Sequence, residues 1–183
     1  MAERYVKTDI PKLAGQSIFF DANILIYIFW PIGSNWQERE YSSILSSLIR
    51  QKNPLIVDNT IISEIYNRAF RLEFDKFAER EHRYVNPSEF KGFRNSAEGQ
   101  QIDKDISTVI KDKILKEFSV VGKSYFKTDI HSLLSSSLLD YSDRIIIDLC
   151  EINHAILLTN DSDFSSSNIP LLTANKKLLI NSP

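Results

Sequence analysis

The chain has 183 residues, of which 43% are hydrophobic, and this is enough for one domain with a core of its own. Its formal net charge is −2, so the total charge neither supports nor excludes a nucleic-acid partner. A single cysteine, Cys150, excludes a disulfide framework and a cysteine-based zinc cluster, and it predicts a reducing compartment.

The most apolar stretch, residues 18–32, is interrupted by Asp21 and Asn23 and is then too short to span a membrane. The first residues lack the order of a signal peptide, in which a basic segment leads directly into an apolar one. We therefore expect a cytoplasmic protein that makes no use of a membrane.

Short apolar runs alternate with segments of helical spacing along the chain. The runs that have the length and composition of strands are residues 17–20, 54–57, 155–159 and 169–173. The segments with helical spacing are residues 22–29, 37–50, 62–72, 102–118, 132–139 and 142–153. This alternation predicts an α/β fold, a three-layer sandwich with a central, mainly parallel sheet flanked by helices.

The middle of the chain is less regular. Between residues 80 and 100 the helical pattern weakens around Pro87, Gly92 and Gly99, and Val120-Val121 is ambiguous between strand and loop. No linker or repeat divides the chain. We predict one domain over residues 1–183, with a helical elaboration at about residues 80–130.

Acidic residues follow two of the predicted strands. Asp21 comes directly after residues 17–20, and Asp161 and Asp163 follow Thr159 and Asn160 at the end of residues 155–159. Ligand sites of open α/β sheets lie at the carboxyl ends of strands, so these acids are expected to share one site. Asn and Asp are also good turn residues, and for Asp163 a role in the turn explains the residue equally well.

Two further acids lie near predicted helix starts. Glu64 and Asp143 are each favoured there by the helix dipole, and Glu64 can also pair with Arg68 one turn later. Two neighbours compete with Asp143. Asp140 is expected to cap the helix, and Asp148 is expected on its solvated face.

The four acids Asp21, Glu64, Asp143 and Asp161 are informative as a set. Carboxylates gathered in one cleft repel each other and need cations to neutralise them. Oxygen ligands without His or Cys suit Mg²⁺ or Mn²⁺, and substrate phosphates often complete the coordination of such ions. Because these ions activate water and stabilise phosphoryl transition states, the set indicates phosphodiester chemistry.

Three stretches resemble, in order, the PIN domain family, metal-dependent nucleases that include the VapC-type toxins. The stretches, FFDANILIYIF, IISEIYNR and DYSDRIIIDLCEINHAILLTNDSDF, fall within residues 16–70 and 138–175. The acids that match the family's four are Asp21, Glu64, Asp143 and Asp161, with Asp163 as a less regular fifth. The positions that support the site in this resemblance are Asn23, Thr159 and Asn160.

The resemblance implies a central parallel sheet, acids around one or two Mg²⁺ or Mn²⁺ ions, and hydrolysis of RNA by metal-activated water. Two features depart from the family pattern. Asn153-His154 replaces the glycine often found before the last motif strand, and Asn153 is expected to take the left-handed conformation there. The chain is also longer than compact toxin members.

Three functions are compatible with these residues. The first is a divalent-metal-dependent endoribonuclease, which could be a toxin with an antitoxin protein as partner. The second is a PIN-like module that binds RNA or protein without cutting. The presence of all four acids argues against it, because a non-catalytic member would be expected to have lost one of them. The third is a phosphatase of the haloacid dehalogenase type, which would require an aspartate in place of Asn23 and would leave Glu64 without a role. Apolar helices at residues 41–48 and 102–114 would suit a homodimer or the core.

Arg68 and Arg71 follow Glu64 and are candidates to contact RNA phosphates, a contact that positions RNA without reading its sequence. Interleaved acids make an ordinary mixed-charge surface about as good an explanation. Nearby aromatic residues could stack bases but more often form core or a partner interface; they are Phe70, Phe74, Phe77, Tyr84, Phe90 and Phe93. The histidines show no ligand-like spacing.

Overall fold

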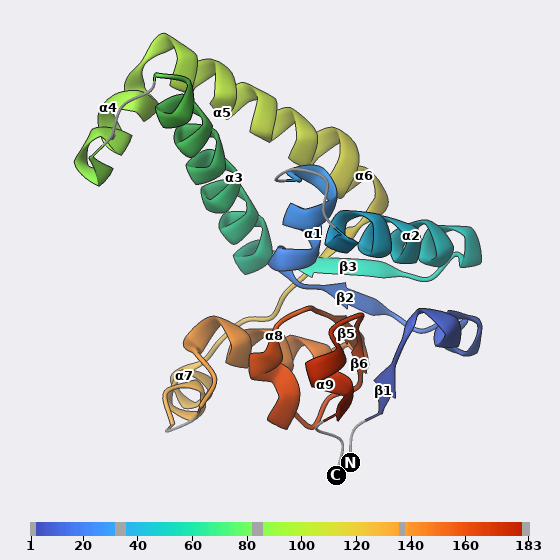
Figure 1. Ribbon diagram of the computed structural model, residues 1–183. Helices are drawn as coiled ribbons and strands as arrows, with labels where there is room; N and C mark the ends of the chain where they lie inside the picture. The colour runs from blue at the N-terminus through green and yellow to red at the C-terminus, as the bar shows by residue number, and fades with distance from the viewer. Residues whose placement is uncertain (1–2, 32–35, 82–85, 136–137, 181–183) are drawn as a thin grey trace.

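The structure is a computed structural model that describes residues 3–31, 36–81, 86–135 and 138–180. Its centre is a six-stranded sheet with the order β1-β6-β5-β2-β3-β4, in which every neighbouring pair is parallel. The strands are β1 (Arg4–Tyr5), β2 (Ile18–Phe20), β3 (Leu55–Asp58), β4 (Ser119–Val121), β5 (Ile156–Leu158) and β6 (Leu171–Leu172). Helices cover both faces of the sheet, which confirms the predicted α/β sandwich (Figure 1).

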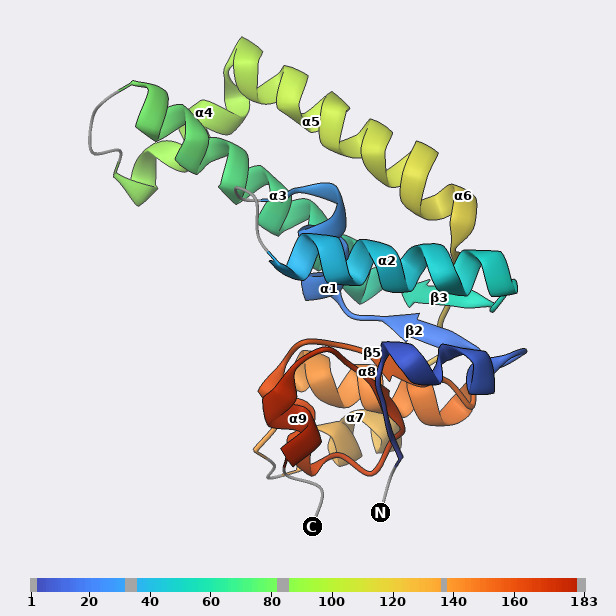
Figure 2. The same cartoon turned by 45° about the vertical axis from the view of Figure 1, so that its right-hand side comes forward.

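One face of the sheet carries the helices that precede β4 in the chain (Figure 2). They are α1 (Ala22–Phe29), α2 (Trp36–Gln51), α3 (Asn59–Arg80), α4 (Phe90–Asn95), α5 (Ala97–Val109) and α6 (Leu115–Glu117). A π-helical turn, η3 (Ile110–Ile114), joins α5 to α6. Both views show α3 and α5 extending beyond the sheet, with α4 at the far end (Figures 1 and 2).

The opposite face carries the helices that follow β4, namely α7 (Lys127–Leu133), α8 (Tyr141–Ile152) and α9 (Lys176–Ile180). Short 3-10 helices occur at η1 (Lys7–Leu13), η2 (Pro87–Glu89) and η4 (Ser162–Ser166). Within the described ranges, no helix has the length and apolarity needed to cross a bilayer.

The central strands were predictable because both of their faces are buried. Every residue of β2, β3 and β5 is buried, and such strands appear in the sequence as continuous apolar runs. The predictions for residues 17–20, 54–57, 155–159 and 169–173 are confirmed as β2, β3, β5 and β6. The edge strands β1 and β4 are partly exposed and have no apolar run, so β1 was missed and β4 was ambiguous.

Two predicted helices have other bounds in the structure. The helix predicted at residues 102–118 begins earlier, as α5 at Ala97. The helix predicted at residues 132–139 is α7, which begins at Lys127 and ends at Leu133. It begins early because the Asp129 carboxylate accepts a hydrogen bond from the Phe126 amide at 2.7 Å and so fixes the first turn. Residues 136–137 of the predicted helix lie outside the described residues.

The end of α8 also differs from expectation. Asn153 has a φ of −92°, and it is His154 that takes the left-handed conformation, with a φ of +48°. Histidine is among the residues that tolerate this region better than most. The Asn153 side chain instead donates to the Leu149 carbonyl at 2.8 Å, the same carbonyl that accepts the Asn153 backbone amide at 3.1 Å.

Candidate functional site

The site lies beside β2, where the chain stops adding strands on one side of the sheet and begins to add them on the other. From β2 the chain builds outward to β3 and β4, then returns to place β5 on the other side of β2 and continues to β6. Asp21 follows β2, and Thr159 to Asp161 follow the neighbouring β5. Such a reversal is the usual place for a ligand site in an open parallel sheet.

Asp21 is held deep in this position, with a relative exposure of 6%. It is the N-cap residue of α1, yet its side chain makes no capping bond to that helix. Its Oδ2 atom instead accepts hydrogen bonds from Thr159 Oγ1 at 2.5 Å and from Asn23 Nδ2 at 2.6 Å. These two bonds fix the Asp21 carboxylate at the edge of a cavity.

Asn160 joins that arrangement to the rest of the molecule. Its backbone amide donates to Asn23 Oδ1 at 3.3 Å, and its side-chain Oδ1 accepts from the Tyr41 hydroxyl at 2.7 Å. Its carbonyl accepts from Asn175 Nδ2 at 2.7 Å, and its Nδ2 donates to the Tyr27 hydroxyl at 3.4 Å. The loop after β5 is therefore tied to α1, α2 and the segment after β6.

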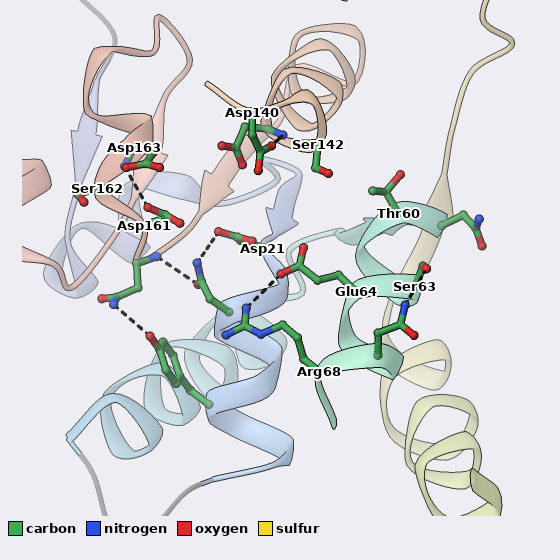
Figure 3. Close-up of a pocket in the computed structure, with 16 residues that line it drawn as sticks. Asp21, Thr60, Ser63, Glu64, Arg68, Asp140, Ser142, Asp161, Ser162 and Asp163 are labelled. Carbon is green, nitrogen blue, oxygen red and sulfur yellow. Dashed lines mark hydrogen bonds and ion pairs between the residues drawn. The ribbon is translucent and has the colours of Figure 1, made fainter. Parts of the chain in front are cut away.

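The cavity beside Asp21 has a volume of about 810 Å³ and is strongly acidic. Figure 3 shows side chains arranged around it from the residue after β2, from α3, from the start of α8 and from the segment after β5. Its acidic lining residues are Asp21, Glu64, Asp140, Asp143, Asp161 and Asp163. Arg68 is the basic residue among the described side chains that line it. All five predicted acids thus line one cavity.

Glu64 enters the cavity from the second turn of α3. Asp58 caps this helix by accepting hydrogen bonds from the Thr60 and Ile61 amides at 3.0 and 2.9 Å. Glu64 Oε1 forms the expected ion pair with Arg68 NH1 at 3.1 Å, and both side chains are more than a third exposed. The pair is worth little to stability at that exposure, so each partner is available to a ligand.

Asp143 and Asp140 reach the cavity from the start of α8. Asp140 is the helix cap, as expected, because its Oδ1 accepts from the Asp143 amide at 2.9 Å. Asp140 nevertheless lines the cavity as well, and the sequence analysis did not predict this second role. The expectation for Asp148 was wrong, since its carboxylate is only partly exposed and pairs with Lys123 Nζ at 2.9 Å.

The cavity perturbs two of its carboxyl groups. Burial raises the pKa of Asp21 to about 6, and the charges of Glu64 and Asp161 add to the effect. Burial also raises the pKa of Asp143 to about 7, with contributions from Asp140, Asp21 and Asp161. Both raised pKa values mean that ionised carboxylates are unfavourable at this site, and a bound cation would reduce that cost.

The chemistry of the donors fits a hard divalent cation. The acids that line the cavity offer carboxylate oxygens, and no His or Cys is among the described lining residues. Within the described ranges, no group of three His, Cys, Asp or Glu side chains is arranged to hold a metal ion as it stands. Asp161 and Asp163, which lie on the lining, are exposed.

Other candidates from the sequence lie elsewhere. Arg71 does not line the cavity, and its guanidinium lies over the Phe90 ring at 5.5 Å. The aromatic side chains of this region pack on one another, for example Phe77 on Phe93 with ring centroids 4.8 Å apart. The explanation of these aromatics as core is confirmed, and Tyr84 lies outside the described residues.

Residues 18–169 match the PIN domain family. The chain belongs to the PIN domain family. PIN domains are generally nucleases that act on RNA and typically use divalent metal ions. The match includes every acid of the cavity and the helices between β3 and β5. No curated protein sequence matches this chain.

Sequence reasoning missed two groups that support this PIN-domain site. Tyr41 lies on the apolar face of α2 and is fully buried, so its pattern predicts packing and gives no sign of the hydroxyl's partner. Asn175 follows β6 by three residues, just as Asn23 follows β2 by three. A polar amide shortly after a buried strand was the available signal.

Proposed function

We propose that this PIN domain is a divalent-metal-dependent endoribonuclease that hydrolyses RNA phosphodiester bonds at the acidic cavity. The observation that carries the proposal is Asp21, a carboxylate that is buried at the strand reversal, raised in pKa and surrounded by further acids. A protein gains nothing in stability from such a group, so a function with a cation explains it best.

The proposed ligands of Mg²⁺ or Mn²⁺ are Asp21, Glu64, Asp143, Asp161 and Asp163. When bound, such an ion activates water and neutralises charge on a phosphoryl group. Thr159 and Asn23 hold the Asp21 carboxylate in one orientation. The Thr159 hydroxyl also accepts from the Asp161 amide at 3.0 Å, which fixes the start of the loop that carries Asp161.

Arg68 has a separate role in this proposal. It is the basic side chain on the cavity lining and is paired with a partly exposed Glu64. When Glu64 binds a cation, its attraction for the guanidinium is reduced, and Arg68 is then available to an RNA phosphate. Arg71 is exposed one turn further along α3 and could contact the RNA backbone outside the cavity.

Cleavage of a mixed RNA pool tests the proposal. The purified protein is incubated with Mn²⁺, with EDTA, and as the Asp161→Asn variant. Asp148→Asn is the matched control, because Asp148 pairs with Lys123 and does not line the cavity. We expect cleavage by the wild type and by the control variant with Mn²⁺ only, and none by Asp161→Asn.

Cleavage that persists in EDTA or in Asp161→Asn would reject the metal-acid site. A folded wild-type protein that binds RNA but cuts nothing in the pool would favour instead a PIN-like module that binds RNA or protein. The same result with no Mn²⁺ binding in calorimetry would remove the cation from the proposal.

A toxin role is the finer part of the proposal, and it rests on the resemblance of the three motif stretches to VapC-type toxins. If it is correct, induced expression in the cytoplasm arrests growth, and expression of Asp161→Asn does not. Rescue by a small co-expressed protein would identify an antitoxin. Light scattering of the purified chain tests whether it forms a homodimer.

A further inference from the structure

A second cavity lies next to the acidic one and has the opposite character. We call it the Trp36 groove; its volume is about 530 Å³, a size that can hold a nucleotide. The lining residues that matter here are Val6, Trp36, Arg39, Ala174, Lys176 and Leu179. They come from the segment after β1, the start of α2, the loop after β6 and α9. Figures 1 and 2 both place the start of α2, and α9, on the side of the sheet where the strands have their carboxyl ends.

The two cavities share a wall. The buried Tyr41 hydroxyl donates to Asn160 Oδ1 on the side of the acidic cavity and accepts from the Ala174 amide, at 3.3 Å, on the side of the groove. The ring of Tyr41 stacks on Tyr27, which lines the acidic cavity, with centroids 5.9 Å apart. The ring of Trp36, which lines the groove, lies tilted against Tyr41 with centroids 6.5 Å apart. Tyr41 therefore contacts lining residues of both cavities, which places the cavities next to each other.

The charge of the groove suits an anion. Its lining carries Lys7, Arg39 and Lys176 against a single acid, Glu40, which is paired with Lys7 at 3.2 Å. Within the described part of the chain, Arg39 and Lys176 form no ion pair. Two basic side chains are thus left to contact phosphates, whereas the neighbouring cavity holds six acids.

Trp36 supplies an aromatic surface in the groove. It is 48% exposed, whereas Trp30, the other tryptophan, is buried at 8%. A large exposed aromatic beside basic residues is the arrangement by which proteins hold single-stranded nucleic acid, with a base on the ring and phosphates on the cations. The apolar side chains of Val6 and Leu179 extend that surface.

We propose that the Trp36 groove is a nucleotide subsite for single-stranded RNA that extends from the acidic cavity. A base stacks on Trp36, and Arg39 and Lys176 bind the adjoining phosphates. This assignment rests on the proposed function for its substrate class. It adds that the strand crosses the wall formed by Tyr41 and Asn160.

Binding in EDTA tests the subsite separately from cleavage. A labelled single-stranded oligoribonucleotide of about ten nucleotides is titrated into the wild type, into Trp36→Ala and into the double variant Arg39→Ala/Lys176→Ala. Ile49→Ala is the matched control, because Ile49 is 40% exposed near the other end of α2. Emission from the buried Trp30 reports that Trp36→Ala is folded.

The expected results differ between the variants. RNA quenches the wild-type tryptophan emission, Trp36→Ala loses the quenching and binds about tenfold more weakly, and Ile49→Ala behaves as the wild type. The double variant binds more weakly at low salt, and its salt dependence falls by about 0.7 in slope for each phosphate that it no longer neutralises. Shortening the RNA until it no longer reaches the groove removes the difference between Trp36→Ala and the wild type.

Equal RNA affinity in all four proteins, without quenching, would overturn the subsite and leave metal-dependent cleavage untouched. Conversely, failure of cleavage with intact quenching would reject the nuclease and not the subsite. If Trp36→Ala instead converts a dimer into a monomer and does not change RNA binding, the groove is an interface between two copies, and the subsite is rejected.

Discussion

Replacing Asp21 by Asn is expected to stabilise the metal-free protein at neutral and higher pH. Burial raises the pKa of Asp21 from 3.8 to about 6, so the folded state resists ionisation of this group. Between those two pH values the folded state keeps a proton that the unfolded state has lost, and stability falls as the pH rises. The difference between a pKa of 3.8 and one of about 6 corresponds to a loss of about 3 kcal/mol in stability above pH 6.

Asn has nearly the same shape as Asp and carries no charge. Its side-chain oxygen can still accept the hydrogen bonds that Asp21 Oδ2 now accepts from Thr159 and Asn23. Asp21→Asn should therefore recover most of the cost, about 3 kcal/mol at pH 8, which for a chain of this length raises Tm by roughly 6 to 12 °C. At pH 4, close to the unfolded pKa of 3.8, most of the gain should be lost, and it should vanish well below that pH, where Asp21 is protonated in both states.

The assay is thermal and urea unfolding in EDTA at pH 4, 6 and 8, repeated with Mn²⁺ at pH 8. Asp58→Asn is the matched control, since Asp58 is also buried at a strand end but caps α3 through two backbone amides. It should not be stabilised at any pH. Mn²⁺ should stabilise the wild type more than Asp21→Asn. A gain that is independent of pH, or a loss of stability at pH 8, would refute the assignment of an uncompensated buried charge.

Three further outcomes are expected. Mn²⁺ affinity measured by calorimetry should rise between pH 5.5 and 7.5, because Asp143, with a pKa of about 7, must lose its proton to bind; a flat profile would exclude it as a ligand. Tyr41→Phe should cost about 1 kcal/mol in urea unfolding and lower kcat more than it raises KM, because its hydroxyl holds Asn160; an effect on stability alone would limit Tyr41 to packing. Arg68→Ala should tighten Mn²⁺ binding, since it removes a cation from Glu64, and should weaken RNA binding at low salt; unchanged affinities would show that the ion pair is only structural.

The position of the acids could be predicted because a parallel strand that is buried on both faces fixes where the residue after it must lie. The apolar runs that become β2 and β5 mark strands covered on both faces, and the next residue must lie at the carboxyl edge of the sheet. Asp21 and Asp161 are therefore placed by the ends of their strands. Glu64 follows in the same way from the end of β3, since α3 begins directly after it.

Contacts made across long sequence separations could not be predicted in this way. Tyr41 and Asn160 are 119 residues apart, and helical spacing says only that Tyr41 faces the core. The course of α7 depended on one Asp129 contact, and the turn after α8 on a left-handed His154, where Asn153 was the expected residue. Such local details depend on individual contacts and backbone angles, which residue patterns do not resolve.

If the proposed function is correct, the difference in charge between the two cavities predicts that RNA binds at the Trp36 groove before it enters the acidic cavity. Six carboxylates and one arginine line the acidic cavity, so an RNA phosphate is repelled from it until a cation has reduced that charge. The Trp36 groove carries three basic residues against one acid, so it attracts the same backbone without a cation. RNA held first at the groove would already lie across the wall of Tyr41 and Asn160, with its neighbouring phosphate beside the acids. RNA should therefore bind at the groove without metal, whereas contact with the acidic cavity and cleavage should require it.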